Sequence, residues 1–282
     1  MNGQGTEFSP LVDITDREFE DLSSMVYTQF GINLTDKKKT LVRGRLHKVL
    51  QARNLGSFSQ YLDVVRRDAT GMVLVELIDR ISTNHTFFFR EADHFSFLHG
   101  DVFQHIAASG ASEIRLWCAG CATGEEAYTL AMLGQTWAEA AGFRGRIRVL
   151  ATDISLTALE HAVKGEYADE RVRLVPQALR QRFFRPTGTQ RWQVDSGLRD
   201  SVLFKRLNFM DASFPFQNQF HVIFCRNVMI YFDRDTKNSL VQKLTGSLLP
   251  GHWLFIGHSE TLGRDLFDLE YVRPSVYRRR QS

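Results

Sequence analysis

The hydrophobic and polar positions of residues 1–80 repeat with the spacing of α-helices. Thr15-Asp16-Arg17-Glu18 forms a capping box ahead of apolar residues that recur three and four positions apart. A second capping box at 57–60 and apolar stripes within 36–50 and 72–81 predict three further helices. This part of the chain is therefore expected to form a small all-α domain.

From about residue 81 the pattern changes to short apolar runs separated by loops and one long helical stretch. Ile114–Trp117 and Ile147–Thr152 read as strands on either side of a predicted helix at Glu125–Ala141, which makes a βαβ unit. Other apolar runs predict five more strands, at 202–206, 221–225, 253–256, 269–272 and 276–279.

The connections decide how these strands pair. Residues 273–275 are too short to cross between parallel strands, so the last two strands must be antiparallel. The sheet of residues 81–282 is therefore expected to be Rossmann-like, mostly parallel with an antiparallel edge strand. The segment 174–204 is rich in turn residues around Arg191–Val194, which predicts a small inserted antiparallel β subdomain.

Composition sets limits on the class of protein. With 282 residues, of which 43% are apolar, the chain can build a small and a larger domain. No apolar run approaches the length of about 18 residues that a membrane span requires, and no signal pattern precedes the first helix. Three cysteines are an odd number and too few for a disulfide framework, so a cytoplasmic protein is expected.

Charge is informative only in one place. The net charge of +3 decides nothing, but residues 36–53 hold seven basic side chains against the single acid Asp36. Such a run favours an anionic partner, although a solvated helix face is the simpler alternative. Nucleic acid is the weaker choice of partner because no aromatic residues alternate with these bases.

The loop after the first strand restricts the cofactor. Ala119–Gly124 lacks a full G-x-G-x-x-G, and Asp153 follows Gly120 by 33 residues, where a dinucleotide site expects about 20. Glu125 and Glu126 open the next helix, which disfavours a phosphate at its N-terminus.

S-adenosylmethionine (SAM) fits these residue types better, because it carries a sulfonium and an ammonium group but no phosphate. We expect Asp153 to accept hydrogen bonds from its ribose hydroxyls, Glu126 to face its cationic end and Arg90 to pair with its carboxylate. Cys118 and Cys121 lack the second ligand pair that zinc needs, so no metal is expected.

The segment 224–232 follows a predicted strand where this type of fold holds the methyl acceptor. Asn227 is followed by Val-Met, whereas enzymes that methylate amide or base nitrogens carry an Asn/Asp-Pro-Pro-aromatic turn. Nitrogen acceptors are therefore disfavoured. His258 and Glu260 are interpreted as part of a structural loop beside the site.

Four segments together resemble the CheR-type chemotaxis receptor glutamate O-methyltransferases, and the resemblance spans nearly the whole chain. They are Thr83–Glu91, Thr123–Glu126, Phe224–Asp233 and Gly257–Glu260. The resemblance implies a class I SAM-dependent methyltransferase fold and methyl transfer from SAM to glutamate side chains on cytoplasmic helices of chemoreceptors. It implies no nucleic acid, no insertion into the membrane, and a monomer.

By position, the resemblance assigns roles to specific residues. Cofactor contacts fall on Asn84, Thr86, Arg90, Glu126, Asp153, Asn208, Phe209, Arg226 and Asn227. Arg90 and Tyr231 are expected to border the transferred methyl group. The basic N-terminal domain is expected to bind the receptor through Lys37, Arg43, Arg45, Lys48 and Arg53.

The chemistry agrees with this assignment, because a glutamate carboxylate, with a reference pKa of about 4.3, is already ionised and needs no general base. Two alternatives stay open. One is methylation of RNA or of another protein, and the other is a SAM-binding module without catalysis.

Overall fold

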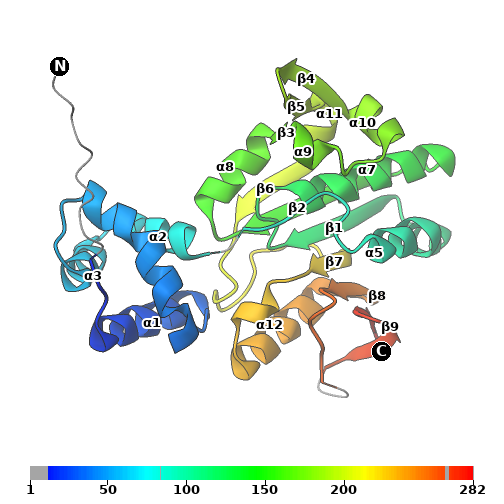
Figure 1. Ribbon diagram of the computed structural model, residues 1–282. Helices are drawn as coiled ribbons and strands as arrows, with labels where there is room; N and C mark the ends of the chain where they lie inside the picture. The colour runs from blue at the N-terminus through cyan, green and yellow to red at the C-terminus, as the bar shows by residue number, and fades with distance from the viewer. Residues whose placement is uncertain (1–11, 83, 264–266, 282) are drawn as a thin grey trace. The chain divides into compact units, whose positions relative to one another are not determined.

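A computed structural model describes residues 12–82, 84–263 and 267–281. The chain folds into two compact units, Met1–Ser82 and Thr83–Ser282 (Figure 1). Within the described ranges, the model contains no helix with the length and apolar character needed to span a bilayer.

The first unit is all-α, as its periodicity predicts. The α-helices described in residues 12–82 are α1 (Asp16–Phe30), α2 (Lys39–Ala52), α3 (Phe58–Arg67) and α4 (Met72–Ile81). The capping box before α1 is present, with the Glu18 amide donating to the Thr15 hydroxyl at 3.2 Å and the Thr15 amide donating to the Glu18 carboxylate at 3.0 Å. The expected helix from residue 36 instead begins as a 3-10 turn, Asp36–Lys38.

The second unit is built on a seven-stranded sheet in the order β6-β2-β1-β7-β8-β10-β9. The five strands from β6 to β8 are parallel, and β10 runs antiparallel to both β8 and β9, which confirms the predicted mixed sheet. The strands are β1 (Glu113–Ala119), β2 (Arg146–Asp153), β6 (Val202–Arg206), β7 (Phe220–Cys225), β8 (Leu248–Ile256), β9 (Leu269–Arg273) and β10 (Val276–Arg279).

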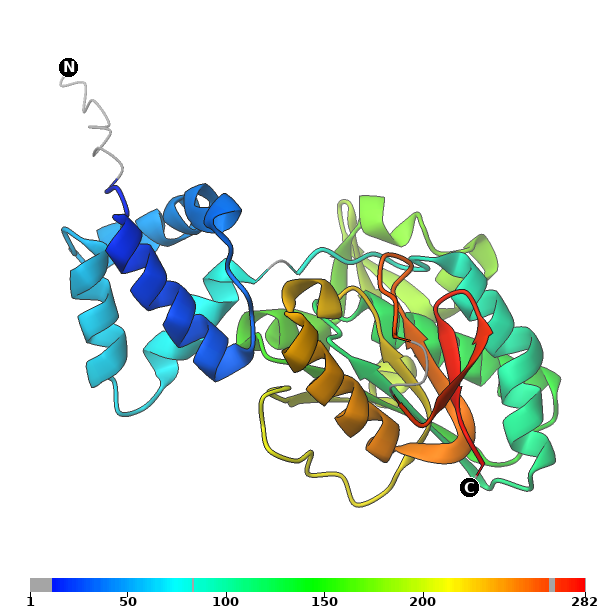
Figure 2. The same cartoon turned by 90° about the horizontal axis from the view of Figure 1, so that it is seen from below.

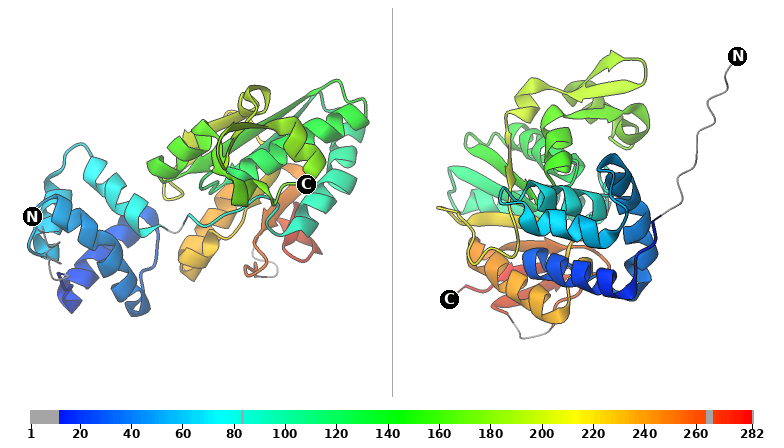
Figure 3. Two further views of the ribbon diagram at one scale, coloured as in Figure 1. Left: turned by 45° about the horizontal axis from the view of Figure 1, so that its top comes forward. Right: turned by 90° about the vertical axis from the view of Figure 1, so that its left-hand side faces the viewer.

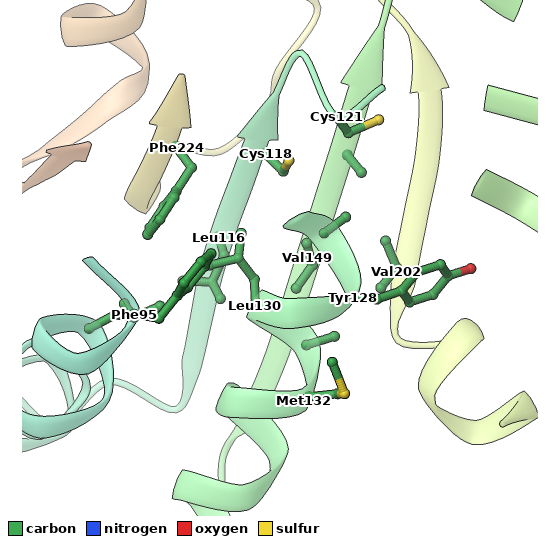
Figure 4. Packing of buried hydrophobic residues seen from close by; sticks show 14 of the residues in the cluster. Phe95, Leu116, Cys118, Cys121, Tyr128, Leu130, Met132, Val149, Val202 and Phe224 are labelled. Atoms are coloured by element: carbon green, nitrogen blue, oxygen red, sulfur yellow. The ribbon is translucent and has the colours of Figure 1, made fainter. Parts of the chain in front are cut away.

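Alternate residues of each strand face opposite layers. In β1, Leu116 and Cys118 join one buried cluster, shown in part in Figure 4, while Trp117 and Ala119 join a second. Helices of the first layer are α5 (Ala92–Phe97), α6 (Phe103–Ala108), α7 (Glu125–Ala140) and α8 (Leu156–Lys164), with a π-helical turn, Leu98–Val102, between α5 and α6. The helix α12 (Arg234–Ser247) covers the other face (Figure 2).

The inserted β subdomain is a separate three-stranded antiparallel sheet in the order β3-β5-β4 (Figure 3). Its elements are β3 (Glu166–Ala168), α9 (Asp169–Val172), α10 (Gln177–Phe183), β4 (Phe184–Gly188), β5 (Arg191–Val194) and α11 (Ser196–Arg199). The subdomain thus begins before the expected range of 174–204, and residues 202–204 belong to β6 of the main sheet. β3 has only three residues, which is too short for a strand pattern to show in the sequence.

Candidate active site

The loop between β1 and α7, residues 120–124, is called the glycine loop and lies at the carboxyl ends of the parallel strands. Gly120 and Gly124 have φ values of 87° and 95°, and a Cβ on Gly120 would lie 2.4 Å from Cγ2 of Val228. Only glycine fits this approach to the segment after β7. The loop therefore packs directly against the segment 224–232, which is predicted to hold the methyl acceptor and is called the acceptor turn below.

Asp153, at the end of β2, holds this loop in place. One carboxylate oxygen accepts the amide of Ala122 at 2.8 Å, and the other accepts the amide of Ser155 at 2.9 Å. The Ser155 hydroxyl lies 3.4 Å from Nδ2 of Asn84, and the amide of Leu207 donates to the Asp153 carbonyl at 3.0 Å. The structure therefore gathers Asn84, the glycine loop and the segment that continues into Asn208 and Phe209 around Asp153.

Arg226 is the centre of a buried charged network. Its side chain is 1% exposed and donates from Nε to Glu126 at 2.6 Å and from Nη1 to Glu91 at 3.2 Å. Nη1 also lies 3.1 Å from Nδ1 of His94, and the guanidinium stacks over the ring of Phe95 at 5.0 Å. Glu91 links the network to the acceptor turn, because its other oxygen accepts from Nδ2 of Asn227 at 3.2 Å.

The network decides which groups can take up a proton or a metal ion. Burial, and then the adjacent Arg226 guanidinium, lower the pKa of His94 to about 4, so its imidazole is neutral at pH 7. Ligand-type atoms of Glu91, His94 and His258 lie within 4.8 Å of one another. A cation there is disfavoured, since Arg226 already donates to Glu91 and His94.

The cysteines of the site are buried thiols. Cys118 donates to the second oxygen of Glu126 at 3.2 Å, while Cys121 and Cys225 are also buried. Burial raises the pKa of all three thiols well above the ordinary value. Protonated and shielded from solvent, they are poor nucleophiles and poor metal ligands.

The acceptor turn is held from below by Glu260. Its Oε2 accepts the amides of Asn227 at 2.9 Å and Gly257 at 2.6 Å, and Asn227 adopts a left-handed φ of 60°. Burial raises the pKa of Glu260, although these amide hydrogen bonds act in the opposite direction. Tyr231 ends the short 3-10 turn that follows and is half-buried.

Arg90 lies in a strained segment. Its neighbours Phe89 and Glu91 both have left-handed backbones, with φ values of 59° and 57°. Nη1 of Arg90 donates to the carbonyl of His85 at 3.0 Å, which leaves further N–H groups of the guanidinium to bind a ligand. The described contacts do not join Arg90 to the Arg226 network.

The phenylalanines of this segment differ in role. Phe88 is 1% exposed and packs edge-on against the subdomain rings of Tyr167 and Phe184, at centroid distances of 5.0 and 5.5 Å. Phe89 packs on a ring of α5, while Phe87 is only half-buried. Phe88 thus anchors this segment in the core, and Phe89 does so in part.

These residues fit SAM. Both Asp153 oxygens accept loop amides, which orients the carboxylate at the end of β2 where a ribose hydroxyl of SAM would donate to it, and Gly120 and Gly124 add no side chain there. Nη2 of Arg226 is buried and makes no hydrogen bond within the described residues, so this polar network lacks one acceptor. Glu126, expected to face the cationic end of SAM, also receives hydrogen bonds from Arg226 and Cys118 on its two oxygens.

Three of the five predicted receptor-binding bases have partners within the first unit. Nη1 of Arg45 donates to the carbonyls of Ile81 and Ser82 at the end of α4, at 2.7 and 2.9 Å. Arg43 and Arg53 pair with acidic side chains at 3.0 and 2.6 Å. Lys37 and Lys48 are exposed, and neither takes part in an ion pair among the residues the structure describes. Among these five bases, charge is therefore most accessible on Lys37 and Lys48.

Reasoning from the sequence missed Glu91 and His94 as members of the site. Glu91 directly follows Arg90, and His94 lies one helical turn further along, but neither belongs to a pattern with a known chemical role. Their importance depends on Arg226, which lies more than 130 positions away in the sequence. Such pairing leaves no local signal.

Comparisons with known proteins agree with this geometry. Residues 17–82 match the family model described as CheR methyltransferase, all-alpha domain, and residues 84–275 match CheR methyltransferase, SAM binding domain. A chemotaxis protein methyltransferase of Borreliella burgdorferi is 41% identical over 283 residues, which cover 99% of this chain and 100% of that protein. That of Salmonella typhimurium is 35% identical over 94% of this chain and 90% of its own length.

The two family matches cover both units of the fold, and the second identifies the cofactor domain. The protein is a SAM-dependent methyltransferase whose sheet, glycine loop and Asp153 form the SAM-binding domain. The chain belongs to the CheR methyltransferase family.

Proposed function

We propose that the protein transfers a methyl group from SAM to glutamate carboxylates on the cytoplasmic helices of chemotaxis receptors, giving glutamate methyl esters. The relatives at 35–41% identity are named chemotaxis protein methyltransferases, which supports a role in that pathway. SAM supplies an electrophilic methyl group. An acceptor carboxylate oxygen forms the new C–O bond as the S–C bond breaks, and S-adenosylhomocysteine leaves.

One observation carries the choice of acceptor: the titratable groups beside the acceptor turn already have partners. His94 accepts a hydrogen bond from Arg226, and Nε2 of His258 lies 3.2 Å from Asp93. Glu91 and Glu126 pair with Arg226. An ammonium acceptor would have to lose a proton to such a group, whereas a carboxylate is ionised without help.

In this proposal the chain's own residues orient the acceptor. Glu260 fixes the acceptor turn through its two amide hydrogen bonds, and the turn presents Tyr231. Arg90, with unbonded N–H groups, would border the methyl group and help align the carboxylate. Positioning is the main catalytic contribution, because no proton has to move.

The first unit would recognise the receptor. Lys37 and Lys48 are exposed cations on it, and acidic receptor helices would be attracted to them. Arg45 is less suited to this role than the sequence indicates, because its guanidinium caps α4. Arg43 and Arg53 would contribute only by exchanging their present acidic partners.

The test is incubation with radiolabelled SAM and a panel of cytoplasmic receptor fragments. The expected result is label that is released by mild base and is lost when the modified glutamates are replaced by alanine. Base-stable label, label on added RNA, or binding of SAM without transfer to any fragment would each overturn the proposal. A fragment with all candidate glutamates replaced serves as the matched control.

A further inference from the structure

Two side chains of the β subdomain reach the glycine loop. Oη of Tyr167, on β3, donates to the carbonyl of Thr123 at 2.7 Å. Arg171, on α9, donates from Nη1 to Oε1 of Glu125. Glu125 is fully buried, and its other oxygen accepts the Thr123 hydroxyl at 2.6 Å. The subdomain therefore holds the loop through both the backbone and a side chain of Thr123.

The same guanidinium also faces the segment before Phe88. Nη1 of Arg171 lies 3.5 Å from the carbonyl of Thr86, and Phe88 packs against Tyr167. Thr86 and the glycine loop come from different parts of the SAM-binding domain, separated by β1. Arg171 is a single group that contacts both.

The glycine loop has little freedom to accommodate a change at this contact. A Cβ on Gly124 would lie 3.0 Å from Oη of Tyr167 and 2.8 Å from Cβ of Ala162. Glu125 lies in the first turn of α7, fully shielded from water, where a carboxylate without its cationic partner is costly. If Arg171 is removed, movement of Glu125 toward water would reduce this cost, and Thr123 would move with it.

We propose that Arg171 and Tyr167 are positioning residues that set the affinity for SAM by fixing the glycine loop relative to Thr86 and the segment before Phe88. The β subdomain is then coupled to the cofactor site. By thermodynamic linkage, a molecule that displaces α9 on binding the subdomain weakens SAM binding, and bound SAM resists that displacement. The proposal depends on SAM binding, which the family establishes, and not on the identity of the methyl acceptor.

The test compares Arg171→Ala with Arg173→Ala. Arg173 directly follows α9 and pairs with Asp169 at 2.5 Å, but its side chain is 69% exposed and the structure shows no contact between it and the loop. Titration calorimetry with S-adenosylhomocysteine gives Kd, and steady-state kinetics give KM for SAM and kcat.

For Arg171→Ala, Kd and KM should rise about tenfold, equivalent to about 1.4 kcal/mol, with kcat at saturating SAM within about twofold. Arg171→Lys should recover part of the affinity, because an ammonium can still donate to Glu125. Arg173→Ala should bind like the unaltered protein.

Two further variants keep the test decisive if Arg171→Ala does not fold. Glu125→Gln keeps the shape but removes the buried charge, and Tyr167→Phe removes only the hydroxyl that donates to Thr123. Each should raise Kd about threefold or more while the protein still melts cooperatively. The proposal is overturned if the folded variants lower the melting temperature but bind S-adenosylhomocysteine within twofold of Arg173→Ala, since that result describes a purely structural contact.

Discussion

Replacing Arg226 by methionine should destabilise the second unit severely. Methionine keeps an unbranched chain over the Phe95 ring but removes the cation that pairs with Glu126 at 2.6 Å and Glu91 at 3.2 Å. Both carboxylates have side chains no more than 12% exposed, so they would face each other with little water. Breaking a buried ion pair by removing one partner costs about 3–5 kcal/mol.

The magnitude can be measured by differential scanning calorimetry. In a unit of this size a loss of 1 kcal/mol lowers the melting temperature by about 2–4 °C, so Arg226→Met should melt about 6–20 °C lower. Arg273→Met is the matched control, because the half-buried side chain of Arg273 also stacks over a phenylalanine ring, at 4.9 Å. Its loss should lower the melting temperature by only a few degrees.

A second variant separates charge from packing. Arg226→Met combined with Glu126→Gln removes one of the two stranded carboxylates, and should recover half or more of the lost stability. The reasoning is refuted if Arg226→Met melts within about 2 °C of Arg273→Met, or if the added Glu126→Gln change brings no recovery. Either result would mean that the buried charges are solvated in a way the structure does not show.

Phe88→Ala removes a ring that is 1% exposed and should lower the unfolding free energy by about 3–5 kcal/mol in a denaturant titration; an unchanged midpoint would contradict its anchoring role. Burial, followed by the nearby His252, lowers the pKa of His221 from 6.5 to about 4. The unfolded chain therefore takes up this proton first, and the stability that neutral His221 provides is complete above pH 6.5 and lost between pH 6.5 and pH 4. As the pH is lowered from 6.5 to 4, the melting temperature should therefore fall, and it should fall less for His221→Gln. Replacing Lys37 and Lys48 by glutamate should slow methylation of receptor fragments about tenfold at low salt and leave SAM affinity unchanged. The control Arg67→Glu, at an exposed position on α3, should have little effect. Equal loss of methylation and of SAM affinity would refute the assignment of receptor binding to these lysines.

The sequence predicts the main sheet well because buried parallel strands are short apolar runs with clear ends. The strands β1, β2, β6 and β7 all lie within one or two residues of the runs that indicate them. The antiparallel direction of β10 follows from the length of one connection. These features depend on neighbours in the sequence.

Features that depend on distant pairing were not predictable. Arg45 has the position of a surface base on a helix, yet it caps a helix 36 residues further along. Glu126 has the position of a cofactor ligand, and it also pairs with a guanidinium 100 residues away. In both cases the residue type and its local pattern are correct, and only the fold reveals the partner.

The packing of Phe88 between Tyr167 and Phe184 has a consequence for protein engineering. These three rings belong to the same buried cluster as the central strands, so the β subdomain has no hydrophobic core of its own. A chimera that exchanges residues 166–199 between relatives would have to carry a compatible residue at position 88 as well. Exchanging the subdomain alone would alter the interior of the whole cofactor domain.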